Sequence, residues 1–206
     1  MLRIGFLISG GGTNMQSVID GVNEGYINGQ IVTVVSSNPK AYGIERAKNA
    51  GIAAIVMRKK DYELPGSYEK ALIKHFEEMK VDLIVLAGFL VILDADFVKA
   101  FPNRILNIHP SLIPSFCGKG FYGIHVHKAV LEKGVKLTGA TVHIATEEAD
   151  DGPIILQKAV EVKDGDTAEI LQKRVMEEAE WFILKEAVRL FADKKIEIIG
   201  NRAITK

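Results

Sequence analysis

The chain has 206 residues, of which 48% are hydrophobic, and its 26 basic residues balance its 26 acidic residues. This composition suits one well-buried domain and excludes both disorder caused by charge and a broadly basic surface for nucleic acid. No apolar run approaches the roughly 20 residues of a membrane span, and a single cysteine excludes an internal disulfide. We therefore expect a cytoplasmic protein that binds small molecules, with neither nucleic acid nor a membrane as partner.

The first half of the chain alternates between strand patterns and helix patterns. Short β-branched runs predict strands and amphipathic segments predict helices, an alternation typical of a parallel sheet with helices on both faces. The expected strands cover residues 3–9, 31–36, 53–57, 83–88 and 105–109, and the expected helices cover residues 14–23, 42–50, 66–79 and 95–101.

After Pro114 the pattern changes. A helix over 125–133 leads into two strands, 137–145 and 154–162, which are separated by the turn residues Asp150-Asp151-Gly152-Pro153. This order favours an antiparallel addition to the sheet. A long helix should follow over about 167–191, with Asp166 as its N-cap. The sequence thus predicts an α/β fold in a single domain over 1–206, with a mostly parallel, Rossmann-like sheet flanked by helices and an antiparallel C-terminal addition.

A glycine-rich loop connects the first strand to the first helix. Its sequence is Ser9-Gly10-Gly11-Gly12-Thr13-Asn14, and backbone amides at such a helix start can bind an anion. The dinucleotide fingerprint fits poorly, because Met15 stands where it has its third glycine and no acidic residue ends the second strand. Two interpretations remain: a site for a small phosphomonoester, or an ordinary tight turn.

The stretch Leu106-Asn107-Ile108-His109-Pro110 places an amide and an imidazole two residues apart at the end of a strand. Residues i and i+2 of a strand share a face, and Pro110 ends the strand at the edge where open α/β sheets bind ligands. Asn can donate a hydrogen bond to an oxyanion, and His can also transfer a proton. The pair therefore indicates catalysis.

Three motifs together resemble the glycinamide ribonucleotide formyltransferase family, within the wider group of formyltetrahydrofolate-using enzymes. They are the Ser-Gly-x-Gly-Thr-Asn loop, the Asn-Ile-His-Pro-Ser-Leu-x-Pro block, and Asp-x-Gly-Pro-Ile-Ile-x-Gln from Asp150 to Gln157, supported by Leu86-Ala87-Gly88-Phe89. The resemblance covers nearly the whole chain. It implies formyl transfer from 10-formyltetrahydrofolate to the amine of phosphoribosylglycinamide, in purine synthesis, through a tetrahedral oxyanion.

The resemblance also implies a role for each matching residue. The catalytic residues would be Asn107, His109 and Asp150, with the charge of Asp150 raising the pKa of His109. The substrate would contact Gly12, Thr13, Asn14, Pro110, Ser111 and a ribose-binding glutamate, Glu180, with Glu177 and Glu178 as rivals. The folate would contact Leu86, Phe89, Ile92, Leu93, Ile105, Ala145, Thr146, Glu147 and Glu148. The phosphate-binding part would cover about 1–100, and the folate and catalytic part about 101–206.

The chain departs from the family pattern at three places. Val91 stands where a basic residue usually holds the folate tail. The connection from Ser115 to Ile124 is longer than the expected Pro-Gly-Leu, and Glu180 comes one residue late relative to Arg174-Val175. No metal is expected, because His125, His127 and His143 lack a nearby carboxylate pattern and are interpreted as packing residues. Cys117 is interpreted as an inert loop thiol.

Several alternatives share parts of this pattern. Methionyl-tRNA formyltransferase normally adds a nucleic-acid-binding domain, and formyltetrahydrofolate hydrolase normally adds an N-terminal regulatory domain; we expect neither here. A non-catalytic binding module is disfavoured by the intact catalytic residues, and a dinucleotide-dependent oxidoreductase by the missing acidic residue after the second strand. The oligomeric state, monomer or homodimer, stays open.

Overall fold

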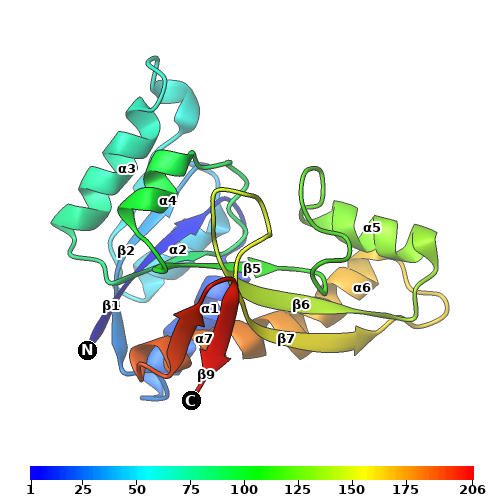
Figure 1. The fold of residues 1–206 in the computed structure, drawn as a ribbon. Coiled ribbons are helices and arrows are strands. Elements are labelled where there is room, and N and C mark those ends of the chain that lie inside the picture. The colour runs from blue at the N-terminus through cyan, green and yellow to red at the C-terminus, as the bar shows by residue number, and fades with distance from the viewer. The chain divides into compact units, whose positions relative to one another are not determined.

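The protein, seen in a computed structural model, is described over residues 1–206, and its chain divides into two compact units, 1–106 and 107–206. This division falls close to the boundary expected near residue 100, while the single domain stays a prediction. Seven strands form one sheet in the order β3-β2-β1-β4-β5-β6-β7, and two further strands form a separate hairpin. Figure 1 shows these elements along the chain.

The first unit contains the expected alternation of strands and helices. Its strands are β1 (Leu2–Ile8), β2 (Gly29–Ser36), β3 (Ala54–Val56) and β4 (Leu83–Leu86). Its helices are α1 (Thr13–Asn23), α2 (Tyr42–Asn49), α3 (Ser67–Glu78) and α4 (Ala95–Ala100), with a short 3-10 turn, η1 (Lys59–Asp61). β1 pairs in parallel with β2 and β4, and β2 with β3. The prediction of a parallel α/β arrangement is confirmed.

The core of this unit packs around β1 and between α3 and α4. Ile4, Phe6 and Leu7 of β1 are fully buried because the strand has a neighbour on each side and side chains pack on both of its faces. On α3, Phe76 packs edge-on against Phe97 of α4 and Phe101. Figure 1 shows α3 and α4 side by side. Burial of these side chains fixes the strand ends that carry the unit's loops.

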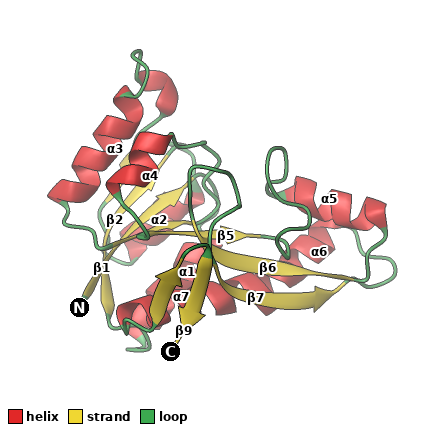
Figure 2. Ribbon diagram, in the orientation of Figure 1, coloured by secondary structure: helices red, strands yellow, loops and turns green.

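Strand β5 (Ile105–His109) begins in the first unit and ends in the second. The second unit continues with α5 (Ile124–Lys133), β6 (Leu137–Ile144) and β7 (Ile154–Glu161). β6 and β7 pair antiparallel, which confirms the expected C-terminal addition. Figure 2 shows β6 and β7 as two long neighbouring strands, which precede the final helices in the chain.

The C-terminal helix differs from the single helix predicted. It consists of α6 (Ala168–Val175), a π-helical turn η2 (Met176–Glu180) and α7 (Trp181–Ala192). Its N-cap is Thr167, whose hydroxyl accepts from the amide of Ile170, rather than Asp166. Asp166 instead forms a bidentate ion pair with Arg174, and it accepts from the amide of Lys163. A carboxylate with a guanidinium partner in reach is satisfied there more fully than at a cap.

A final hairpin, β8 (Ile196–Ile199) and β9 (Arg202–Thr205), lies beyond the last element that we predict. Its alternating side chains and the Gly200-Asn201 turn are typical of a hairpin. Gly200 has a φ of +58°, a left-handed conformation that favours glycine. No helix of the chain is long and apolar enough to cross a membrane.

Candidate active site

Asn107 and His109 lie near the end of β5, and both side chains reach Asp150. Nδ1 of His109 lies 3.5 Å from Oδ2 of Asp150. Nδ2 of Asn107 donates to Oδ1 of the same carboxylate at 3.4 Å. The i, i+2 spacing on the strand therefore does direct both groups to one place. The structure brings together the three residues that the sequence singles out.

His109 is only 4% exposed, and its ring has an acceptor on each side. Nε2 faces the carbonyl oxygen of Phe116 at 2.9 Å, and a carbonyl only accepts, so Nε2 carries a proton. Nδ1 faces the carboxylate of Asp150. A protonated His109 would thus satisfy both ring nitrogens.

Burial nevertheless has the largest effect on the pKa of His109, and the net shift of this pKa is downward. Removal of the ring from water lowers this pKa, while Asp150 and the carbonyl of Phe116 raise it only in part. The expectation that the charge of Asp150 raises the pKa of His109 is confirmed, although the net shift is downward. The carboxylate acts in the expected direction, but desolvation outweighs it.

Asp150 is held as an anion. Burial alone would raise its pKa, but His143, His109 and the amide of Gly118 together lower it. The Gly118 amide donates to Oδ2 at 2.8 Å. Asp150 has a φ of +57°, a conformation that aspartate tolerates better than most residues. The turn residues of the sequence thus aim a charged carboxylate at His109.

His143, which we interpreted as a packing residue, belongs to this cluster. It is 1% exposed on β6, and its Nε2 lies 3.0 Å from Nδ2 of Asn107 and 3.5 Å from Oδ1 of Asp150. Its Nδ1 faces the carbonyl of Ile144 at 3.0 Å. The sequence spacing gives no sign of this contact, because the contact depends on β6 lying beside β5 in the sheet.

A buried hydroxyl on β6 anchors the chain just after β5. Thr141 Oγ1 donates to the carbonyl of Ser111 at 2.7 Å and accepts from the amide of Ile113 at 3.1 Å. Gln157 of β7 donates to the same hydroxyl and to the carbonyl of Ile113, both at 3.0 Å. The hydroxyl of Ser111, a predicted substrate contact, donates to the carbonyl of Ser115. These bonds fix the path of the segment that follows His109.

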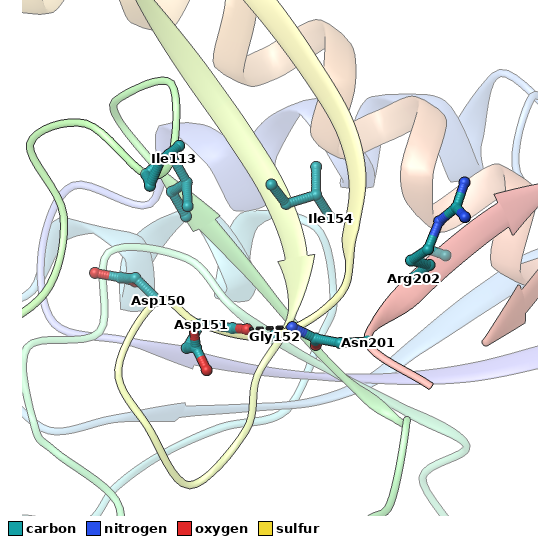
Figure 3. A pocket seen from close by; sticks show the side chains of 9 residues that line it. Ile113, Asp150, Asp151, Gly152, Ile154, Asn201 and Arg202 are labelled. Atoms are coloured by element: carbon teal, nitrogen blue, oxygen red, sulfur yellow. Dashed lines mark hydrogen bonds between the residues drawn. The ribbon is translucent and has the colours of Figure 1, made fainter. Parts of the chain in front are cut away.

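A cavity of about 340 Å³ borders Asp150. Ile113 and Pro114 line it together with Asp151, Gly152 and Ile154, and Asn201, Arg202 and Ala203 of the C-terminal hairpin complete the lining. Figure 3 shows the hydrogen bond, 3.4 Å long, from Nδ2 of Asn201 to the carbonyl of Asp151. The hairpin therefore supports the loop that carries Asp150.

In the first unit, the glycine loop has the geometry of a close backbone approach. Gly12 precedes α1 as its N-cap with a φ of +73°, and a Cβ there would lie 2.7 Å from the Cα of Gly43. Arg46 donates from Nε to the carbonyl of Gly11 at 2.9 Å. This places a cation beside the loop, a contact that the sequence pattern does not predict. A positive side chain and a helix start both favour an anion.

The ribose-binding candidate, Glu180, ends the π-helical turn and is 6% exposed. A π turn accommodates one residue more than an α turn does. This gives a physical reason for a glutamate that comes one residue late relative to Arg174-Val175. Its rivals, Glu177 and Glu178, are exposed. The burial therefore favours Glu180, and its contact with a substrate stays a prediction.

The predicted folate residues fall in both units. Those of the first unit range from fully buried Ile105 to Ile92, which is 81% exposed. Leu86, Phe89 and Leu93 are half-buried. In the second unit, Ala145 and Thr146 are half-buried, and Glu147 and Glu148 are exposed. The folate slot that they would form stays a prediction.

The remaining candidates have separate environments. The Cys117 thiol donates to the carbonyl of Pro114, and burial and then the nearby acidic residues raise its pKa, as befits an unreactive thiol. His125 stacks edge-on against Tyr122, and His127 is fully buried. No group of three or more His, Cys, Asp or Glu side chains in the chain is arranged to hold a metal ion.

Comparison with known proteins gives this site a context. The formyl transferase profile matches residues 2–188. The chain belongs to the formyl transferase family. It is 40% identical to a chloroplastic phosphoribosylglycinamide formyltransferase of Arabidopsis thaliana, over 95% of this chain and 67% of that protein. It is 37% identical to the phosphoribosylglycinamide formyltransferase of Escherichia coli, over 98% of this chain and 92% of that protein.

Formyl transferases of known structure share the whole fold. A glycinamide ribonucleotide transformylase from Symbiobacterium toebii matches with a TM-score of 0.94 and 45% identity, over 100% of this chain and 94% of that one. The chain also matches 19% of the length of the trifunctional purine biosynthetic protein of Homo sapiens, at 40% identity. The family resemblance inferred from three motifs is therefore confirmed.

Proposed function

We propose that the protein transfers the formyl group of 10-formyltetrahydrofolate to the amine of phosphoribosylglycinamide, a step of purine synthesis. The observation that carries this proposal is the cluster of Asn107, His109 and Asp150, in which a side-chain nitrogen of Asn107 and one of His109 each lie within 3.5 Å of the Asp150 carboxylate. The names and extents of the related proteins support the choice of substrates. Both substrates are small molecules, and a cytoplasmic location agrees with the single cysteine.

The residues divide the chemistry between them. In the transfer, a bond forms between the acceptor nitrogen and the formyl carbon, the bond from that carbon to N10 of the folate breaks, and one proton passes from the acceptor nitrogen to N10. Asn107 and His109 donate hydrogen bonds to the oxygen that becomes negative. Such donors stabilise the transition state because the charge they meet is absent from the ground state. Asp150, held as a carboxylate, accepts the proton of the attacking amine directly or through a water.

The segment 115–123, which we call the flap, must give up a hydrogen bond to His109 during this reaction. In the present structure two groups of the flap are hydrogen-bonded to these residues. The carbonyl of Phe116 accepts from Nε2 of His109, and the amide of Gly118 donates to Asp150. His109 can donate from Nε2 to the formyl oxygen only after its hydrogen bond to the Phe116 carbonyl is broken. We assign the substrate sites as the sequence predicts them. The phosphate would contact residues 12–14, and the rest of the acceptor would contact Pro110, Ser111 and Glu180. The folate would contact Leu86, Phe89, Ile92, Leu93, Ile105 and residues 145–148.

A spectroscopic assay of a 10-formylfolate analogue tests the proposal. We expect release of the deformylated folate only when phosphoribosylglycinamide is present, with formation of its formylated product. Release without the acceptor would identify a hydrolase instead, and binding of the folate analogue without release under either condition would identify a binding module.

A further inference from the structure

We propose that His143 is a positioning residue that sets the orientation of the catalytic amide of Asn107. An amide side chain has a donating end and an accepting end of nearly equal size, and only the donating end can stabilise an oxyanion. Which end faces the reaction centre therefore matters as much as where the side chain lies. This inference rests on the proposed function.

The proton of His143 is located by its neighbours. Nδ1 lies 3.0 Å from the carbonyl oxygen of Ile144, which can only accept, so Nδ1 carries a proton. In the neutral ring Nε2 then carries a lone pair and accepts from Nδ2 of Asn107, and only the doubly protonated ring donates to Asp150 and lowers the pKa of that carboxylate. The ring is 1% exposed on β6, so no solvent competes for this lone pair.

Asn107 meets two acceptors. Its amide nitrogen lies 3.0 Å from Nε2 of His143 and 3.4 Å from Oδ1 of the Asp150 carboxylate. If the amide were turned over, its oxygen would face both acceptors and no hydrogen bond would form. The two acceptors together hold the NH₂ group inward. The longer bond, to Asp150, is the weaker of the two, and its N–H is the one free to move to the formyl oxygen.

Asp150 alone does not ensure this orientation. Its carboxylate also accepts from the amide of Gly118 and lies 3.5 Å from His109 and from His143. When Asp150 takes the proton of the attacking amine, it becomes able to donate and no longer repels the amide oxygen. His143 is the acceptor that keeps its role throughout the reaction, because neither bonded neighbour changes its charge.

A double-mutant cycle distinguishes positioning from general support of the fold. We expect His143→Leu to lower kcat by about 10- to 100-fold, the effect of one misdirected oxyanion donor, and to change either KM by less than about threefold. In the Asn107→Ala background, where there is no amide to orient, the same substitution should change kcat by less than about threefold. Equal losses in the two backgrounds would overturn the proposal, as would an unchanged kcat in the single variant.

Two further variants control the cycle. His143→Gln restores an accepting oxygen and should recover part of the lost kcat; a glutamine variant no better than the leucine variant would count against the proposal. Thr138→Val changes another buried polar group of β6, one whose hydroxyl has no hydrogen-bond partner. It should leave kcat unchanged, and a loss as large as that of His143→Leu would mean that any change in this strand impairs the enzyme.

A measurement without substrates separates this inference from the proposed function. Nitrogen-15 NMR of the imidazole rings in the ligand-free protein should show His143 with a protonated Nδ1 and an unprotonated Nε2 near neutral pH. A protonated Nε2 would overturn the positioning role even if formyl transfer is observed. Conversely, absence of formyl transfer by the wild type, with the expected ring state, would contradict only the proposed function.

Discussion

At the scale of single residues, spacing predicts what one element can align. Asn107 and His109 share a face of one strand, and Asp150 follows in a turn, so their types and positions predict the cluster that the structure brings together. His143 could not be found in this way, because its contact with Asn107 crosses from β6 to β5. The sequence predicts the direction in which Asp150 shifts the pKa of His109, but not the larger, opposite effect of burial, because burial depends on the folded chain.

The charge of Asp150 should control the pH dependence of turnover. We predict that Asp150→Asn lowers kcat by at least about 100-fold, the scale of a lost proton-transfer group. It should also move to lower pH the fall in kcat that accompanies loss of the His109 charge, because a charged ring stabilises an oxyanion more strongly than a neutral ring does and removal of the carboxylate lowers the pKa of His109 further. Asparagine tolerates the positive φ of this position, so the turn is retained.

The neighbouring carboxylate is the matched control. Asp151 is exposed and offers its backbone carbonyl, not its side chain, to Asn201. Asp151→Asn should keep the pH profile and most of the rate. A severe loss in Asp151→Asn with a mild loss in Asp150→Asn would show that the wrong carboxylate had been chosen. A pH–rate series of the three proteins decides between these outcomes.

At the scale of elements, the sequence predicts the helices and strands that have a strong hydrophobic periodicity and turn residues at their ends. The alternating first unit and the β6–β7 pair follow from such patterns. The π turn does not, because it is a one-residue change of helical register inside a continuous amphipathic segment. The N-cap also differs from the prediction, Thr167 in place of Asp166, because Arg174, about two turns along the helix, binds the aspartate. Long-range partners thus override local signals.

The glycine loop offers a test of phosphate binding at this scale. Gly11 has nothing within 4 Å of the position of an added Cβ and no positive φ, whereas a Cβ on Gly12 would collide with the backbone of Gly43. We predict that Gly11→Val weakens binding of phosphoribosylglycinamide by about 10-fold or more, the value of one lost charge-assisted hydrogen bond. Titration of each substrate by calorimetry measures the effect.

Three comparisons make this test specific. Folate affinity and the melting temperature of Gly11→Val should stay close to those of the wild type. The dephosphorylated acceptor should bind the wild type poorly, and its affinity for Gly11→Val should be the same as for the wild type. If the variant still prefers the phosphorylated acceptor as strongly as the wild type does, the loop is a tight turn and the phosphate is bound elsewhere.

At the scale of the whole molecule, buried histidines make stability depend on pH. Burial, and to a lesser extent His109, lower the pKa of His127 from 6.5 to about 4, and neither of its ring nitrogens has a hydrogen-bond partner. Between these pKa values the unfolded chain takes up a proton that the folded chain does not. The free energy of unfolding therefore falls as the pH falls, by about 1.4 kcal/mol per unit from this residue.

Urea denaturation at about pH 7 and about pH 5 measures this contribution. The wild type should lose about 2 kcal/mol more between the two conditions than His127→Leu does. His75 and His109, whose pKa values burial also lowers, act in the same direction and remain in both proteins. An equal pH dependence in the wild type and the variant would show that His127 takes up its proton in the folded state as readily as in the unfolded state.

The central claim is that Asn107 and His109 stabilise the oxyanion of formyl transfer, and the turnover of their alanine variants tests it most directly. With both substrates saturating, we predict that Asn107→Ala and His109→Ala each lower kcat by more than about 100-fold, while folate binding measured by fluorescence titration stays within about threefold of the wild type. A wild-type kcat in either variant, or a loss accounted for by weaker folate binding, would contradict the assignment.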